Sequence, residues 1–309
     1  MVDKKPLLVD KRRLRGAQKQ STCKKIEKKF AITKRIGIFG QNTLNTMHKK
    51  TILLIIDPQN DFCNPKGALY VPNAEKDISR IGDMLVQHGD KIDEIIITAD
   101  DHIPYDIAHP DFWFDRVGAH PTPFTTVTLQ DINDGTYTTA SADDLNTATK
   151  YIEQLEALGR THTIWPRHCI SGTWGADIDP ALLTRIFDWM QGTSRRYRIV
   201  RKGWYPYSEH FGAFEAEIAT PTEESTLFNA PLARTLNDYM QIFIAGEAKS
   251  HCVCNTIKQL MDKAPELVKK LVILDDAMSP VAGCDTAADD TIAAAQKLGA
   301  KVTTTTTVF

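Results

Sequence analysis

Residues 51–57, TILLIID, form a continuous apolar run of the length of a buried strand, and the run ends in a carboxylate. Residues 93–100, DEIIITAD, repeat this form and again end in Asp. Four later runs are further strand candidates, at 196–203, 240–246, 271–277 and 300–306. Because the runs are unbroken and do not alternate with polar residues, they indicate strands that are covered on both faces.

Helical segments are predicted between these strands, at residues 75–89, 254–270 and 285–300. The second of them places Ile257, Leu260 and Met261 on one face, as expected for a helix that packs on a sheet. The alternation of strands and helices predicts an α/β fold. We expect a doubly wound, mostly parallel sheet of about six strands with helices on both faces, in three layers.

Two segments fall outside this regular pattern. Residues 1–48 are basic: the first 50 residues contain 15 Lys or Arg and 3 Asp or Glu, although the net charge of the chain is −2. We expect a disordered extension there, followed by one domain at 49–309. Two alternatives are that the native chain starts at Met47, and that the basic tail contacts nucleic acid or an anionic membrane. Residues 110–164, with one clear helix at about 143–159, predict an insertion folded over one edge of the domain.

The composition is that of a globular protein, with 42% apolar and 25% charged residues. The six cysteines are scattered and no signal peptide precedes them, which predicts reduced thiols and a cytoplasmic protein. The longest aliphatic run, Ile52 to Ile56, is too short to span a bilayer. We therefore expect no membrane association of the domain itself.

Reactive side chains follow four of the predicted strands. Asp57 follows the first strand, Asp100 and His102 follow the second, Lys202 ends the third, and Cys252 follows the fourth. Ligands of open parallel sheets bind beyond the carboxyl ends of the strands, so these side chains are predicted to meet at one edge.

Cys252 is the candidate nucleophile. It lies close to the predicted start of a helix, where the helix dipole and the free backbone N–H groups favour a thiolate. Cys254 falls on the apolar face of that helix and is predicted to be a small core residue. The alternatives for the C-x-C pair are a metal clip, which would need further ligands, and a redox pair.

A cysteine nucleophile needs an activator. Asp57 can accept the thiol proton, and the Lys202 ammonium can lower the pKa of the thiol. A buried salt bridge between Asp57 and Lys202 is the alternative. His251 adjoins Cys252, but adjacent side chains at such a turn point apart, so we expect His251 to orient or pack.

A second cluster has the residue types of a metal site. Asp100 and His102 form D-x-H after a strand, His168 comes from a distant W-P-x-H, and His109 lies nearby in sequence. One Asp and two His leave positions open on a divalent metal, as catalytic sites require. Ordinary surface histidines are the alternative.

Five stretches resemble the nicotinamidase branch of the isochorismatase-like cysteine hydrolases, and they occur in the family's order. They are LLIIDPQNDF (53–62), ITADDH (97–102), IWPRHCISGTWGADI (164–178), RKGWYPYSEHFGAFE (201–215) and IAGEAKSHCVCNT (244–256). The resemblance implies the isochorismatase-like three-layer fold and a catalytic triad of Asp57, Lys202 and Cys252.

The resemblance also implies the remaining parts of the site. The metal ligands would be Asp100, His102 and His168, with His109 as a candidate further ligand. A cis peptide is expected at Glu247–Ala248. The amides of Ala248 and Cys252 would form an oxyanion hole, and aromatic walls would come from Phe62, Trp165 and Phe211.

The implied activity is that of a metal-containing cysteine amidohydrolase that converts nicotinamide to nicotinate and ammonia, as in NAD salvage. The cofactor would be a divalent ion, with zinc favoured and iron or manganese as alternatives. A small amide would be the substrate and a homo-oligomer the expected assembly. Alternatives are a related hydrolase of another small amide, a carbamoyl, ureido or isochorismate-type substrate, and a non-enzymatic protein that binds a polyanion through its basic tail.

The segment between D-x-H and W-P-x-H is longer than in compact nicotinamidases. Both of its ends are held near the predicted metal site, so we expect it to form a lid or an edge wall. Phe112, Trp113 or Phe114 should then lie close to the pocket. The alternative is that the segment packs on a neighbouring subunit or on the back of the domain.

Overall fold

A computed structural model describes residues 50–282 and 285–309, so the expected N-terminal extension lies outside the described residues. A six-stranded sheet is the centre of the fold, in the order β10-β9-β8-β1-β2-β7, and every neighbouring pair is parallel. Its strands are β1 (Thr51–Ile56), β2 (Glu94–Asp100), β7 (Arg196–Lys202), β8 (Gln241–Gly246), β9 (Leu271–Leu274) and β10 (Lys301–Thr303). The predicted α/β fold with a parallel sheet is confirmed.

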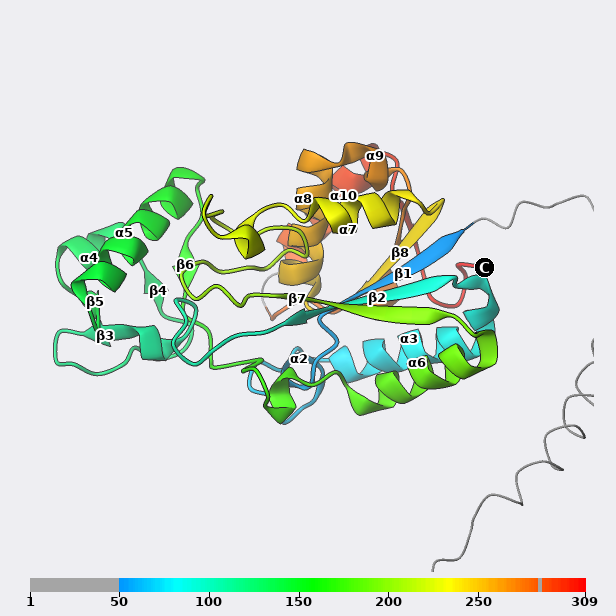
Figure 1. Ribbon diagram of the computed structural model, residues 1–309, viewed down its shortest axis with the longest axis horizontal. Coiled ribbons are helices and arrows are strands. Elements are labelled where there is room, and N and C mark those ends of the chain that lie inside the picture. The colour runs from blue at the N-terminus through cyan, green and yellow to red at the C-terminus, as the bar shows by residue number, and fades with distance from the viewer. Residues whose placement is uncertain (1–49, 283–284) are drawn as a thin grey trace, which may run out of the picture. The chain divides into compact units, whose positions relative to one another are not determined.

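Helices cover both faces of the sheet (Figure 1). Helices α3 (Ala74–His88) and α6 (Pro180–Thr193) lie on one face. The other face carries α7 (Ala230–Asn237), α8 (Cys254–Lys263), α9 (Pro265–Val268) and α10 (Asp285–Lys297). Helices α6 and α7 were not among the sequence predictions. The single helix predicted over 254–270 is divided, because Pro265 lacks an N–H group and disfavours helical backbone in the residue before it.

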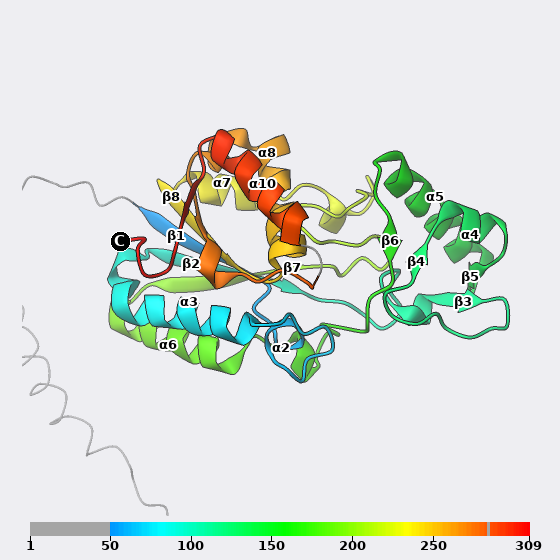
Figure 2. The same cartoon turned by 180° about the vertical axis from the view of Figure 1, so that it is seen from behind.

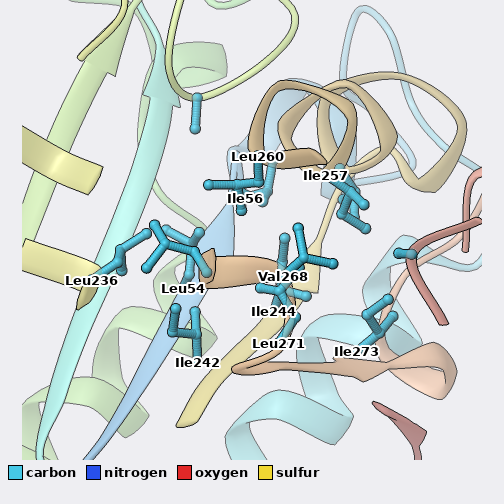
Figure 3. Close-up of a cluster of buried hydrophobic side chains, with 14 of the residues drawn as sticks. Leu54, Ile56, Leu236, Ile242, Ile244, Ile257, Leu260, Val268, Leu271 and Ile273 are labelled. Atoms are coloured by element: carbon cyan, nitrogen blue, oxygen red, sulfur yellow. The ribbon is translucent and has the colours of Figure 1, made fainter. Parts of the chain in front are cut away.

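Strand β1 shows why its sequence is apolar throughout. Leu54 and Ile56 belong to the core cluster beneath α8, whereas Leu53 and Ile55 belong to the cluster beneath α3 and α6. Figure 3 shows the first cluster, in which Ile257 and Leu260 of α8 face Ile56 and Ile244 of the sheet. Successive side chains of a strand point to opposite faces, so a strand buried on both faces needs no polar position.

Strand β7 departs from this pattern. It is the edge strand beyond β2, and Ile199 is 40% exposed. The expectation that this run is covered on both faces is therefore wrong, since Arg196, Arg198 and Arg201 are exposed along it. Only its last residue, Lys202, is buried.

The chain between β2 and α6 builds a second group of elements beyond the carboxyl ends of the strands (Figures 1 and 2). It contains two antiparallel pairs, β3 (Trp113–Asp115) with β5 (Tyr137–Thr139) and β4 (Thr126–Val127) with β6 (His162–Thr163). Helices α4 (Leu129–Asn133) and α5 (Ala142–Ala157) complete it. These elements enclose a separate core cluster that includes Phe112, Trp113, Tyr151, Ile152 and Ile164. We call residues 103–164 the insertion body.

Short helical elements connect the larger ones. They are α2 (Asn60–Cys63), 3-10 turns at Gly89–Lys91, Pro110–Phe112, Trp174–Ala176, Glu224–Thr226 and Asp275–Ala277, and a π-helical turn at Lys249–Val253. Among residues 50–282 and 285–309, none of the helices has the length and apolar character that crossing a bilayer would require.

Candidate active site

Four strand ends bring the predicted catalytic side chains into one buried group. Lys202, at the end of β7, places Nζ 3.0 Å from Asp57 Oδ2 and 3.8 Å from Cys252 Sγ. The same ammonium also bonds to Asp100 Oδ1, at the end of β2. Each of these four residues is at most 5% exposed, so water does not screen their charges.

The backbone at the ends of β1 and β8 is specialised. Asp57 has a left-handed φ of 42°, a conformation that non-glycine residues adopt at an energetic cost. Gly246 has φ of 109°, and a Cβ atom there would lie 2.1 Å from the carbonyl oxygen of Ile56. Glycine is thus required for β8 to approach β1 at this point. The next peptide bond, Glu247–Ala248, is cis, as expected.

Burial and charge set the protonation of this group. Burial raises the pKa of the Cys252 thiol well above its usual value, although the Lys202 ammonium opposes the shift. The expectation that the helix start makes Cys252 a thiolate is therefore wrong for the free protein. Cys252 lies in the π-helical turn ahead of α8, and desolvation outweighs the favourable charge. Burial also raises the pKa of Asp57, which makes this carboxylate a better base than usual.

The two neighbours of Cys252 have other surroundings. Cys254 is fully buried and its Sγ lies 3.6 Å from the carbonyl oxygen of Ala288 in α10. His251 bonds through Nδ1 to Ser250 Oγ at 2.9 Å, and its ring packs on Trp165 with centroids 5.3 Å apart. Neither arrangement gives these side chains a direct contact with the Asp57 and Lys202 pair.

The predicted metal ligands also come together. Asp100, His102 and His168 each offer a ligand atom, and these atoms lie within 4.8 Å of one another. His102 Nε2 is buried and has no hydrogen-bond partner among the described residues. Gly203 leaves room beside it, because a Cβ atom there would lie 3.3 Å from His102 Nε2. An unpartnered imidazole nitrogen next to a carboxylate and a second imidazole fits a divalent metal.

Each imidazole is oriented by its other nitrogen. His102 Nδ1 lies 3.1 Å from Asp106 Oδ2, and His168 Nδ1 lies 2.9 Å from the carbonyl oxygen of Pro166. Burial opposes protonation of His102, but the carboxylates of Asp106 and Asp100 raise its pKa to about 9. Carboxylate and carbonyl partners of this kind fix ligand histidines toward a metal.

His109 is buried beside this group but does not join it. Its Nε2 lies 3.3 Å from His168 Nδ1. This is the His168 nitrogen that also faces the Pro166 carbonyl oxygen, so it is not the one left for a metal. The geometry makes His109 a support behind His168.

One pocket joins the two clusters, with a cavity volume of about 30 Å³. Its lining includes all three predicted aromatic walls, Phe62, Trp165 and Phe211, together with the proposed oxyanion residues Ala248 and Cys252. Asp100 and His168 form part of the same lining. The predicted nucleophile and two of the predicted metal ligands therefore line the same pocket.

Sequence reasoning missed several residues of this site. Glu209 lines the pocket, is 4% exposed, and has no partner for Oε2 among the described residues. Gln59 Oε1 accepts a hydrogen bond from the Asp100 amide at 2.7 Å, and Gln59 Nε2 donates to the Asp100 carbonyl oxygen at the same distance. Asp106 is the missed residue that the sequence could have indicated, because it follows His102 by four residues and a carboxylate often orients a ligand histidine.

The aromatic residues at the start of the insertion body do not reach the pocket. Phe112 and Trp113 are fully buried in the core of the insertion body, and Phe114 packs on His120. The expectation that one of them lies close to the pocket is wrong, because they fill the insertion body's own core. Phe124, Tyr151 and Leu155 instead line a groove next to the pocket.

Known proteins share both sequence and fold with this chain, although no family model matches it. The nicotinamidase of Saccharomyces cerevisiae is 27% identical over 229 residues, which cover 74% of this chain and 88% of that protein. The nicotinamidase of Acinetobacter baylyi is 27% identical over 224 residues, or 72% and 78% of the two chains.

Two solved structures show the same fold. A nicotinamidase and pyrazinamidase of Acinetobacter baumanii superposes with a TM-score of 0.55 at 20% identity, over 84% of this chain and 99% of the other. The yeast nicotinamidase bound to the inhibitor nicotinaldehyde gives a TM-score of 0.54 at 22% identity, over 82% and 99%. The chain thus has the isochorismatase-like fold and is a distant homologue of nicotinamidases.

Proposed function

We propose that this nicotinamidase-like chain is a metal-containing cysteine amidohydrolase that converts nicotinamide and water to nicotinate and ammonia. The observation that carries the proposal is that Cys252, which contacts Lys202 and through it Asp57, lines the same pocket as Asp100 and His168 of the predicted metal group. The distant homology to two nicotinamidases supports the choice of an amide as substrate.

Asp57 acts as the general base. Thr98 Oγ1 donates to Asp57 Oδ1 at 2.6 Å, which orients the carboxylate, and Oδ2 faces Lys202. Asp57 takes the proton of Cys252, and the thiolate attacks the carboxamide carbon. The Lys202 ammonium stabilises the negative charge while it lies on sulfur, because both groups are desolvated.

The same carboxyl group completes both halves of the reaction. Asp57 returns its proton to the leaving nitrogen, so ammonia departs and a Cys252 thioester remains. A water molecule then gives a proton to Asp57 and attacks the thioester carbon. Cleavage of the C–S bond then releases the carboxylic acid, which ionises to nicotinate in solution, and Asp57 passes its proton to the sulfur of Cys252.

The carbonyl oxygen becomes negatively charged in both steps. We assign its stabilisation to the backbone amides of Ala248 and Cys252, which both belong to residues that line the pocket. Donors of this kind typically contribute about 10²–10³-fold to kcat each.

The aromatic ring of the substrate would lie between Phe62 and Trp165, with Phe211 alongside. Asp100, His102 and His168 would hold a divalent ion, for which we propose zinc, with iron and manganese as alternatives. When bound, the ion would supply a ligand position for the pyridine nitrogen. His102 and His168 are held by Asp106 and Pro166 in the orientation that leaves one nitrogen of each ring available.

Ammonia release from a panel of amides tests the proposal. Nicotinamide should give the highest kcat/KM, and benzamide should be poorer because it lacks the pyridine nitrogen. A chelator that removes the metal should lower the rate of ammonia release from both amides. Ureido, carbamoyl and isochorismate-type compounds belong in the same panel. Turnover of one of these with none of nicotinamide would reject the proposed substrate and favour the related hydrolase.

A further inference from the structure

A groove of about 520 Å³ adjoins the catalytic pocket, and no step of the proposed reaction uses it. One wall comes from the insertion body, through α5, the turn at 159–161 and β6. The other wall comes from α8 and the chain after β7. Five residues line both the groove and the pocket, so the two spaces are neighbours: Trp165, Glu209, Phe211, His251 and Val281.

Aromatic rings form the boundary between the two spaces. The Trp165 ring lies perpendicular to His251 at 5.3 Å, to Phe211 at 6.1 Å and to Phe124 at 6.0 Å. Phe124 is 59% exposed although it lines the groove, so its ring is available to a ligand. Rings of this kind favour contact with the flat or aliphatic part of a ligand.

The part of the groove formed by α8 carries a cation without an ionic partner. Lys258 is exposed, lines the groove, and forms no ion pair with any described residue. Arg160 faces the same space from the insertion body and pairs with Glu217, yet its side chain remains 45% exposed. Glu209 is the other carboxyl group of the groove lining; it lies at the boundary with the pocket, where burial raises its pKa to about 7. Lys258 is therefore the cation of the groove that is available to an anion.

Lys258 lies within reach of a ligand held at Cys252. It is six residues further along the chain, which at the rise of a helix corresponds to roughly 9 Å. Lys258 and His251 both line the groove. A substrate anchored at Cys252 would therefore need an arm of roughly 9 Å to place an anion at Lys258.

We propose that this groove is a second substrate subsite, which binds the anionic arm of an aromatic carboxamide larger than nicotinamide. The inference rests on the proposed function, because the amide end of the same molecule would react at Cys252. Trp165 and Phe124 contact the body of the arm, and Lys258 and Arg160 bind its terminal anion. The insertion body would thereby favour amides with an anionic arm over amides without one.

A matched pair of substrates tests the subsite. Each is a pyridine-3-carboxamide with an arm of roughly 9 Å; one arm ends in a carboxylate and the other in its methyl ester, and arms at ring positions 5 and 6 are compared. We expect kcat/KM for the acid to exceed that for the ester at least about tenfold for one isomer, which corresponds to about 1.4 kcal/mol of transition-state binding. Equal values for acid and ester in both isomers would overturn the inference.

Lys258→Gln should reduce this preference to about threefold or less while leaving kcat/KM for nicotinamide unchanged. Lys269→Gln is the matched control, since Lys269 is exposed and lines neither the groove nor the pocket. A preference for the acid that survives Lys258→Gln, or that Lys269→Gln removes equally, would also overturn the inference.

Binding separates the subsite from the chemistry. Titration calorimetry of the acid and the ester against Cys252→Ala, with and without Lys258→Gln, measures the groove without turnover. If the wild-type protein releases no ammonia from any amide, the proposed function fails. Tighter binding of the acid that depends on Lys258 would still support an anion subsite, and equal affinities would reject it.

Discussion

The carboxyl edge of the sheet and the insertion body are built in opposite ways. At the sheet edge, the ends of β1, β2 and β7 and the turn after β8 each deliver one side chain, and Lys202 Nζ lies 3.0 Å from Asp57, 2.5 Å from Asp100 and 3.8 Å from Cys252. In the insertion body, short antiparallel pairs enclose large aromatic side chains that face inward. The first region positions reactive groups by backbone geometry, whereas the second forms a stable wall through side-chain packing.

Polar and apolar contacts join the two regions, and Tyr207 and Ile218 pack against the core of the insertion body. Asp144, at the start of α5, accepts hydrogen bonds from Tyr105 at 2.9 Å and from Tyr207 at 2.8 Å. Tyr207 belongs to the loop that follows Lys202, so α5 is tied to the chain beside the catalytic group. The catalytic side chains come from the sheet edge and the groove wall comes from the insertion body, so the two can be changed separately by mutation.

The largest effect is expected from the nucleophile itself. Cys252→Ala should lower kcat by at least about 10³-fold, as removal of a catalytic nucleophile does in other hydrolases. Cys254→Ala should retain most of the activity, because its sulfur contacts Ala288 on α10. Steady-state ammonia release measures both. Equal losses from the two changes, with folding intact, would contradict the assignment of Cys252.

Metal binding should depend on the sheet edge and on one residue just beyond it. Protein purified without chelator should hold near one equivalent of a divalent metal, and His168→Ala should hold little, because a three-ligand site loses most of its affinity with one ligand. Asp106→Asn should weaken metal affinity by about 10–100-fold through loss of the group that orients His102. Asp111→Asn, which only breaks a surface pair with Arg167, is the control. Full activity with less than about a tenth of an equivalent of metal would reject the site.

Two tryptophans test whether the regions are separate cooperative units. Trp113 is fully buried in the insertion body and donates to the Ile107 carbonyl at 2.8 Å. We call the rest of the described domain, residues 50–102, 165–282 and 285–309, the sheet body. Trp189 on α6 is 4% exposed there and donates to the Gly89 carbonyl at 2.9 Å. Replacing either by Ala should cost about 3–5 kcal/mol of unfolding free energy in its own region.

Hydrogen exchange should then localise the damage. Trp113→Ala should expose amides of residues 105–164 and leave β1, β2 and β8 protected. Trp189→Ala should lower protection in those strands. If Trp113→Ala lowers protection in both regions alike, the insertion body is part of one cooperative fold and the comparison above does not hold.

The sequence predicts the two regions unequally well, for physical reasons. The runs at 51–57 and 93–100 indicate buried strands because both faces of β1 and β2 are covered, and parallel strands must then bring Asp57 and Asp100 to one edge. Strand β7 differs, because Arg196, Arg198 and Arg201 interrupt its apolar residues and are exposed, and this pattern fits its position at the edge of the sheet. Glu209 lies in a loop held by hydrogen bonds of Ser208 to Ile218, of Glu217 to Glu209, and of Ala213 to Thr256 on α8, and local sequence specifies none of them.

The insertion body shows a different limit. Its aromatic residues indicate an ordered segment, and the segment is ordered. The direction in which Phe112 and Trp113 point depends on whether the segment has its own core, and sequence distance from His102 does not determine this. Phe124, which does line the groove, lies in a stretch without a distinguishing pattern, and Tyr151 lies on a predicted helix whose sequence does not show that it borders a groove.

The smallest effect concerns a second carboxyl pair in the sheet body, behind the nucleophile loop. Glu247 is fully buried, its Oε2 accepts the Ser279 amide at 3.2 Å, and Asp77 bonds to the Ser279 hydroxyl. Burial, together with the neighbouring Asp77 carboxylate, raises the pKa of Glu247 well above its usual value, so the folded protein holds it protonated. In the unfolded chain Glu247 ionises near its ordinary value of 4.5.

This pair should make the sheet body less stable as pH rises. Between the unfolded and the folded pKa of Glu247, the folded state binds one more proton, so the free energy of unfolding falls by at most about 1.4 kcal/mol per pH unit. Glu247→Gln keeps the neutral shape and removes the titration. The free energy of unfolding of the variant should therefore match that of the wild type near pH 5 and exceed it increasingly at higher pH.

Urea unfolding across this range measures the difference in free energy. Hydrogen exchange should assign it to β1 and β8 and not to residues 105–164. Glu266→Gln, at an exposed position on α9, is the control that should leave the pH dependence unchanged. A pH profile in which Glu247→Gln runs parallel to the wild type would show that the Glu247 carboxyl does not hold its proton in the folded protein.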